Sequence, residues 1–500
     1  MDALTELVGT VGEYVWYVVF AILIGVGLYL TVRTGVIQLR GLPEMFRVLT
    51  DPPGDAEDGK KGISSFRAFT VSAAARVGTG NIAGVAIAIS LGGPGAVFWM
   101  WTIAAIGAAS AFTESLLGQL YKIKSRDGYV GGPAYYMERG LKKRWMGLIF
   151  AVTITITYGF VFNSVQSNSI VDAVSGSFNL DMADSQNLWI RIVIGLALVA
   201  ITAAVIFGGI RSISNVTQIV VPVMAILYLI LGLLVVALNI TEVPAMFLMI
   251  VEGAFGIREF VTGSLIGVII QGMKRGLFSN EAGMGSAPNA GATASVSHPA
   301  KQGFVQSLGV YFDTMIVCSV TAFIILLSNP TFGDERQGAS LTQTALGAQL
   351  GDWAIHFLTV AIFLFAWSSV IGNYYYGESN IRFMTGSRAV MTGYRFLVLA
   401  CVFLGAIAAL DLVWSLADLF MAFMATINLI ALVGLAGVAA KVLRNYMDQR
   451  KAGVEPVFHS GDIPGLSGLG AWDGTDFVTT REHWIVQAEE KAEKKEAKRG

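Results

Sequence analysis

Long apolar stretches alternate with short polar ones along almost the whole chain. A run of about 20 apolar residues is long enough to cross the hydrocarbon core of a bilayer as a helix. Applied to the 500 residues of this sequence, that rule predicts about eleven transmembrane helices. They cover residues 13–32, 66–90, 95–121, 146–170, 190–209, 216–239, 260–290, 305–327, 353–376, 393–410 and 414–440. The pattern is typical of an all-α, multi-pass membrane protein.

Polar residues and glycines interrupt two of these spans where a membrane helix is normally most apolar. In the second span they are Gly78, Thr79, Gly80 and Asn81, and in the seventh they are Gly272, Gly276, Ser279, Asn280, Glu281, Gly283 and Gly285. Backbone groups that leave the helix at membrane depth are costly unless they line a cavity or bind something. We therefore predict a site at the two breaks. The competing interpretation is close helix packing, as in the spacing Gly80-x-x-x-Gly84.

The breaks open two consecutive sets of five helices, residues 63–241 and 242–445. Interrupted segments at corresponding places in two halves point to an inverted-repeat transporter with its binding site at the midplane. One extra helix and a loop, residues 1–62, precede the repeats, and residues 446–500 form a tail. The sequence thus predicts a five-plus-five inverted repeat preceded by one helix.

Basic residues are concentrated in alternate loops. They are Arg33, Arg40, Arg47, Lys60, Lys61 and Arg67 after the first helix, and Lys122, Lys124, Arg126, Arg139, Lys142, Lys143 and Arg144 after the third. The loop 91–95 has no charge, and the stretch 171–189 carries acidic residues only. Because cytoplasmic loops keep positive charge, we expect the N-terminus outside and the C-terminus in the cytoplasm. The composition of 455–475 and 486–500 predicts a mobile tail.

Composition narrows the class of function. Hydrophobic residues make up 54% of the chain and charged residues 14%, against about a quarter charged in soluble proteins, so a lipid bilayer is the expected surrounding. A net charge of -1 gives no sign of nucleic-acid binding, which needs a clustered basic surface. The two cysteines and four histidines lack metal-ligand spacing, and no catalytic constellation is present. The sequence predicts a protein that is not an enzyme.

Three stretches carry a family resemblance. They are VGTGNIAGVAIAISLGGPGAVFWMW, GGPAYYMERGL and RGLFSNEAGMGSAPNA. Over about residues 10–445 the chain resembles the alanine or glycine:cation symporter family. That resemblance implies the fold of the bacterial leucine transporter, an inner-membrane location in a bacterium, and sodium-coupled uptake of a small amino acid such as alanine or glycine.

The resemblance also implies roles for individual residues. The stretch Gly78 to Asn81 is similar to the Gly-x-Gly-Asn of the first core helix in that fold, and it would meet the substrate carboxylate or a cation. A half-helix N-terminus, with its free N–H groups, suits such a carboxylate. Hard cations prefer oxygen ligands, and in the related fold an adjacent pair of serines completes a sodium site with carbonyls of the broken helix. The matching residues here are Ala74, Val77, Ser368 and Ser369.

Further candidates for the substrate site are the polar residues Gln166 and Asn280 and the bulky residues Phe278, Met284 and Trp367. Bulk beside the site leaves room only for a small side chain, although aromatic and Met residues in membrane spans more often face lipid or fill packing gaps. The predicted substrate is therefore a small neutral amino acid.

Charged residues inside the predicted spans include Arg76, Glu114, Lys274, Arg275, Glu281 and Asp313. Isolated charges in hydrocarbon are expensive, so we expect them to be paired. Proton coupling is the main alternative to sodium, because buried Glu114, Glu281 or Asp313 could titrate. An ion channel is a second alternative, because Gly-rich broken helices also build selectivity filters.

Overall fold

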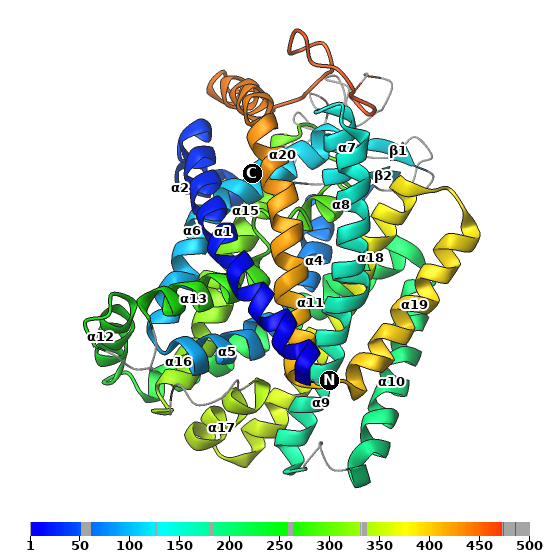
Figure 1. Cartoon of the computed structure of the whole chain (residues 1–500). Coiled ribbons are helices and arrows are strands. Elements are labelled where there is room, and N and C mark those ends of the chain that lie inside the picture. The colour runs from blue at the N-terminus through cyan, green and yellow to red at the C-terminus, as the bar shows by residue number, and fades with distance from the viewer. Residues whose placement is uncertain are drawn as a thin grey trace, which may run out of the picture.

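The computed structural model describes residues 2–51, 62–125, 128–180, 185–258, 264–330, 332, 338–472, 474 and 486. Helices make up nearly all of this structure, as Figure 1 shows. Large apolar side chains stay exposed on the outward sides of the bundle, as with Leu233 (62% exposed) and Phe396 (61%). Buried polar side chains lie inside it. This inverted distribution suits a lipid solvent and confirms the membrane class.

In the described part of the chain, nine helices are long and apolar enough to cross a membrane, or ten if one bent pair counts as a span. Those made of one continuous helix are α1 (Asp2–Thr34), α6 (Gly95–Leu120), α10 (Leu188–Ile206), α11 (Gly209–Leu238), α18 (Asp352–Met384), α19 (Arg388–Ile407) and α20 (Leu410–Lys451). The other two spans each consist of two α-helices joined by a π-helical segment. One is made of α8 (Arg144–Ile156), η2 (Thr157–Phe162) and α9 (Asn163–Phe178). The other is made of α15 (Ala300–Val310), η4 (Tyr311–Cys318) and α16 (Ser319–Leu326). The exact number of eleven spans stays a prediction.

The bent pair is the second predicted span. It consists of α4 (Ser65–Arg76), the 3₁₀ turn η1 (Thr79–Asn81) and α5 (Ala83–Gly92), and the chain turns by 60° between the two halves. The structure therefore confirms the predicted break at Gly78 to Asn81.

The seventh predicted span is also broken. Helix α13 (Leu265–Asn280) has 16 residues and ends where Glu281 adopts a left-handed backbone, with φ +56°. Gly283 (φ +84°) and Gly285 (φ +80°) follow in conformations that favour glycine. The short helix α14 (Ala287–Gly291) comes next. The predicted interruption is therefore real from Glu281 onward, but it is wrong for Gly272 and Gly276, which lie inside the continuous helix α13 and pack closely against α6.

Short elements cover the two ends of the bundle. Toward the end that holds the N-terminus lie η3 (Ser185–Asn187), α12 (Val243–Ala254) and α17 (Ala339–Leu350), none of which was predicted. At the other end lie α2 (Ile37–Arg40), α3 (Leu42–Leu49), the antiparallel pair β1 (Ile123–Ser125) and β2 (Gly128–Val130), and α7 (Pro133–Arg139). The basic loops identified in the sequence belong to this second end.

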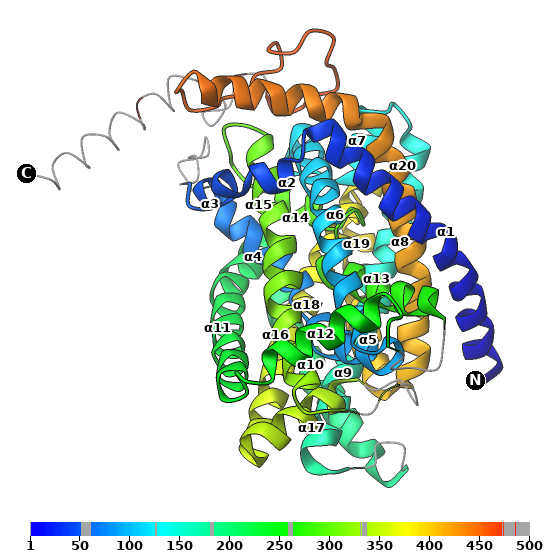
Figure 2. The same cartoon turned by 90° about the vertical axis from the view of Figure 1, so that its left-hand side faces the viewer.

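The predicted mobile tail is wrong for residues 453–472, which fold back onto the basic end of the bundle (Figure 2). The Phe458 amide donates to the Ser297 carbonyl at 2.9 Å. The Trp472 indole donates to the Leu120 carbonyl at 3.0 Å, and both aromatic rings are fully buried. Burying such rings stabilises a Gly- and Pro-rich segment that would otherwise be mobile. The charged stretch 487–500 lies outside the described residues.

Candidate functional site

The first break is held open by the Asn81 side chain, which replaces lost helical bonds. Its Oδ1 accepts a hydrogen bond from the Gly78 amide at 3.0 Å, and its backbone carbonyl accepts one from the Thr321 hydroxyl at 2.6 Å. The Gly78 amide also donates to the Arg76 carbonyl, and the Asn81 amide donates to the Gly78 carbonyl. In a continuous helix these two amides would bond the carbonyls of residues 74 and 77. The break therefore frees those two carbonyls.

One of the freed carbonyls meets α18. The Ser369 hydroxyl donates to the Ala74 carbonyl at 2.8 Å and is also 3.0 Å from the Phe365 carbonyl of its own helix. The neighbouring Ser368 hydroxyl bonds Phe365 at 2.9 Å and lies 3.7 Å from the sulfur of Met224. The structure thus brings together Ala74 and Ser369 of the predicted sodium site. In the described residues no hydrogen bond joins Val77 or Ser368 to that contact.

Gln166 reaches the same break from α9. Its Oε1 accepts a hydrogen bond from the Thr79 amide at 3.2 Å. The Thr79 hydroxyl is buried and has no hydrogen-bond partner among the described residues. Gly78 lies between Gln166 and Ser369, because an added Cβ there would be 3.2 Å from Gln166 Oε1 and would overlap the Ser369 hydroxyl. Glycine is therefore required by space at this position.

The second break depends on Glu114, which lies in the last third of α6. Its carboxylate accepts hydrogen bonds from the amides of Gly283 at 3.3 Å and Gly285 at 3.0 Å. Asn428 of α20 donates to the same carboxylate at 2.8 Å and to the Gly283 carbonyl at 2.9 Å. These bonds satisfy backbone groups that α13 leaves free. In the sequence, Glu114 stands out only as a charged residue inside a predicted membrane span.

The two breaks touch each other. The side-chain Nδ2 of Asn81 donates to the Ser279 hydroxyl at 2.9 Å and to Asp313 Oδ1 at 2.6 Å. Ser279 also donates to the Asp313 carboxylate, and the Thr314 hydroxyl lies 3.0 Å from it. This oxygen-rich junction joins η1, α13 and η4. Sequence reasoning identified Ser279 and Asp313 separately, as a polar break residue and a charge in a span, but did not place them together.

Asn280 follows Ser279 at the end of α13. Its Oδ1 accepts a hydrogen bond from the Ala282 amide at 3.0 Å, while its Nδ2 is buried without a partner among the described residues. Each break therefore presents a buried polar side-chain atom without a partner in the part of the chain that the structure describes: Thr79 Oγ1 from the first and Asn280 Nδ2 from the second. Buried polar groups of this kind need an explanation, and a bound ligand is one.

A cluster of aromatic rings lies beside the first break. The Phe278 ring packs on the backbone of Gly80, where an added Cβ would lie 2.8 Å from it. It also contacts Phe162 at 4.8 Å and Trp414 at 5.0 Å between ring centroids. Two other predicted residues, Met284 and Trp367, have no hydrogen bond to the junction in the described contacts. Met284 is fully buried within the second break, and Trp367 is half-buried on α18 with an indole N–H that has no partner among the described residues.

The predicted pairing of buried charges holds for part of the set. Arg76, Glu281 and Arg275 have ion-pair partners, whereas in the described contacts Glu114 and Asp313 accept hydrogen bonds from neutral groups. Arg76 lies 4.0 Å from Glu281 and donates to the Gln306 carbonyl at 3.1 Å. Arg275 pairs with Asp418 of α20. Asp418 was missing from the predicted set of charges, although it lies in the predicted span 414–440. These contacts link α4 and α13 to the helices around them.

Comparison with known proteins agrees with this geometry. The chain is 50% identical over 468 residues to the amino-acid carrier protein AlsT of Bacillus subtilis, covering 94% of this chain and 97% of that one. It is 47% identical to the probable sodium/glutamine symporter GlnT of the same organism (95% and 98%). It is 38% identical to the sodium/alanine symporter AgcS of Methanococcus maripaludis (83% and 90%).

Solved structures define the fold. The crystal structure of MhsT in complex with L-phenylalanine aligns with a TM-score of 0.55 at 12% sequence identity, over 76% of this chain and 98% of that one. This likeness confirms the leucine-transporter-like fold. The sequence pattern of the sodium:alanine symporter family matches residues 1–460. The chain is a multi-pass membrane transporter for amino acids, not an enzyme, and it belongs to the sodium:alanine symporter family.

Proposed function

We propose that this protein is a sodium-coupled symporter that takes up a small neutral amino acid, alanine or glycine, across the bacterial inner membrane. Its N-terminus would lie outside and its C-terminus in the cytoplasm. Family membership supports amino-acid symport in general. The observation that supports sodium is the hydrogen bond from Ser369 to the freed carbonyl of Ala74.

The proposed sodium site lies where α18 meets the first break. Its ligands would be the Ala74 and Val77 carbonyls and the hydroxyls of Ser368 and Ser369. In the structure the Ser369 hydroxyl hydrogen occupies the Ala74 carbonyl, so a cation would replace that hydrogen bond with two oxygen ligands. Ser368 would have to turn from its bond to Phe365 to join them. Neutral oxygens suit a monovalent cation without requiring a group that titrates.

The proposed substrate site lies at the junction of the two breaks. The substrate carboxylate would bind the N–H groups and hydroxyl of the stretch Gly78 to Asn81, and it would displace Gln166 from the Thr79 amide. Asn280 Nδ2 would supply a further donor. Phe278 closes this space from one side, which supports a small side chain, and Met284 and Trp367 would restrict it further. A half-helix N-terminus favours the negative charge.

Coupling follows from the shared backbone of the first break. The carbonyls of residues 74 and 77 would bind the ion, and the amides a few residues later would bind the substrate carboxylate. Because either ligand fixes the conformation of this one segment, each favours the state that accepts the other. An ion and a substrate bound to opposite ends of one short segment therefore move together.

Sodium coupling can be tested by labelled alanine uptake into proteoliposomes. Wild-type uptake should require an inward sodium gradient, and Ser369→Ala should raise the half-saturating sodium concentration at least tenfold or abolish uptake. Thr426→Ala is the matched control, because the Thr426 hydroxyl bonds only the Ala422 carbonyl of its own helix in the described contacts. Full wild-type uptake in sodium-free buffer would rule out the sodium assignment.

Proton coupling is the second candidate, and the observation that favours it is the Asp313 carboxylate at the junction. A group that carries a proton through the cycle must change its charge, which Asp313 could do and the serines could not. Asp313→Asn separates the two ideas. Under proton coupling this variant should lose pH-gradient-driven uptake while retaining exchange of labelled for unlabelled alanine. Under sodium coupling the wild type should show no uptake on a pH gradient alone.

A further inference from the structure

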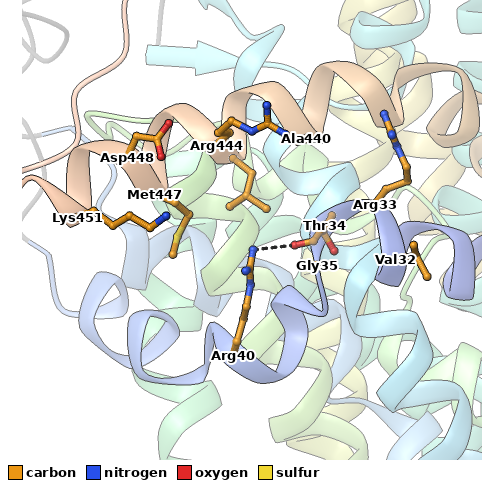
Figure 3. Close-up of a pocket in the computed structure, with 11 residues that line it drawn as sticks. Val32, Arg33, Thr34, Gly35, Arg40, Ala440, Arg444, Met447, Asp448 and Lys451 are labelled. Carbon is orange, nitrogen blue, oxygen red and sulfur yellow. Dashed lines mark hydrogen bonds between the residues drawn. The ribbon is translucent and has the colours of Figure 1, made fainter.

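A cavity of about 320 Å³ lies away from the two breaks, between the corner formed by α1 and α2 and the end of α20. Figure 3 shows side chains from both sides turned into this space. The corner is sharp because Gly35 (φ +65°) and Val36 (φ +58°) adopt left-handed backbone conformations. The cavity is large enough for a small polar group, at the lower end of the range for ligand sites.

Four cations and one carboxylate line the cavity. Arg33 and Arg40 come from the α1–α2 corner, and Arg444 and Lys451 come from α20 together with Asp448. Arg40 donates to the Thr34 carbonyl at 3.0 Å, so its guanidinium is held inside the corner. In the part of the chain that the structure describes, no carboxylate oxygen lies within 4 Å of the side-chain nitrogens of these four cations. The cavity therefore carries a surplus of positive charge.

Neighbouring basic residues at the same end of the molecule are paired. Lys301 bonds Asp51 at 2.8 Å, and Arg47 bonds Glu44 at 2.8 Å. Arg450, on the same helix as Arg444, bonds Glu44 at 3.0 Å. The tendency of basic residues to gather at one membrane face accounts for their number, but it does not account for a concave group of them left without carboxylate partners.

The cavity lies where the apolar stretch of α1 gives way to basic residues, which is the pattern expected at headgroup level. The apolar stretch of α1 ends at Val32, which is 78% exposed, and basic residues begin at Arg33. Leu39, on α2, is 57% exposed beside the same corner. Val32, Leu443 and Met447 also line the cavity. Its surroundings are thus amphipathic, with cations next to surfaces that face acyl chains.

We propose that this cavity binds the phosphate of an anionic phospholipid headgroup, such as that of phosphatidylglycerol, and that the lipid bridges α1 and α20. Basic pockets between membrane helices at headgroup level bind anionic lipid headgroups. Arg40 and Arg444 supply the forked donors that match phosphate oxygens. Lys451 adds a point charge. The acyl chains lie along the exposed apolar side of α1.

The test is native mass spectrometry of the full-length protein, delipidated in detergent and titrated with phosphatidylglycerol or zwitterionic phosphatidylcholine. The test variant is Arg444→Gln with Lys451→Gln, because neither side chain has a hydrogen bond in the described contacts. Lys441→Gln is the control for position, since it removes one positive charge from α20 outside the cavity, just as each cavity substitution removes one. Each cation near anionic lipid is worth about fivefold in affinity, so the double variant should lose roughly 25-fold for phosphatidylglycerol.

Phosphatidylcholine binding should be weak and equal in all three proteins, and this equality also reports that the double variant is folded. An equal loss of phosphatidylglycerol binding in Lys441→Gln, or no loss in the double variant, would overturn the proposal. Inorganic phosphate tests whether the cavity binds free phosphate rather than the phosphate of a lipid headgroup. If excess phosphate displaced phosphatidylglycerol with the same dependence on Arg444 and Lys451, the cavity would be a free-phosphate site and the lipid assignment would be wrong.

Discussion

The substitution Gly78→Ala tests whether the contact between the first break and α18 is needed for transport. The backbone of Gly78 is extended (φ -134°, ψ -151°), so alanine brings no strain of its own. The obstacle is space, because the new Cβ would lie 3.1 Å from the Ser369 Cβ and would overlap the Ser369 hydroxyl. Overpacking of this kind costs about 1–3 kcal/mol. The overlap can be removed if Ser369 moves away from the Ala74 carbonyl, and this movement would disrupt the proposed sodium site.

The measurement pairs thermal unfolding in detergent with sodium-dependent alanine uptake. Gly78→Ala should be destabilised and should lose uptake, whereas Gly393→Ala should be neutral or slightly stabilised, because nothing lies within 4 Å of a Cβ at that exposed helical position. Adding Ser369→Ala to Gly78→Ala should recover part of the stability by removing the overlapping oxygen, while uptake stays lost. Wild-type uptake in Gly78→Ala would refute the proposed contact.

Three further predictions concern the supports of the site. Glu114→Gln should destabilise the second break by about 1.5–3 kcal/mol, because it sets an amide NH₂ against backbone N–H donors; unchanged thermal stability would contradict that role. Asp418→Asn should cost about 3–5 kcal/mol by leaving Arg275 buried without its partner, and an unaltered unfolding temperature would exclude it. Burial disfavours the charged form of Glu455, but Lys301 stabilises it, and the net effect is a lowered pKa of Glu455. The stability that this ion pair contributes is therefore complete above the unfolded-state pKa of about 4.3. It is lost as the pH falls through the pKa of the folded state. Amide-exchange protection factors in residues 455–472, which correct for the intrinsic pH dependence of exchange, should therefore fall on acidification below pH 4, and equal protection at neutral and acid pH would count against the tail contact.

The sequence was sufficient to predict the broken helices because their signal is local. Polar residues and glycines at the centre of an apolar stretch conflict with a continuous helix, and both predicted breaks are present at Gly78 and after Asn280. The adjacency of Ser369 and Ala74 came from the family resemblance, since no local pattern connects residues 295 positions apart.

Other features depend on long-range packing and could not be predicted. The meeting of Asn81 with Ser279 and Asp313 depends on how three separate helices rotate against one another, which composition does not record. The packing of the tail could not be predicted either, because its local composition points to a different outcome. Its many glycines and prolines favour mobility, yet the burial of Phe458 and Trp472 outweighs that tendency, and only the structure shows the surface that receives them.

The most direct measurement of coupling at the first break is equilibrium binding of labelled alanine to the purified protein at increasing sodium, with potassium keeping ionic strength constant. If one segment holds both ligands, alanine affinity should rise with sodium, and alanine should raise sodium affinity by the same factor. Ser369→Ala should remove this dependence while the control Thr426→Ala keeps it. Alanine affinity that is equal in sodium and in potassium would contradict coupling at this break.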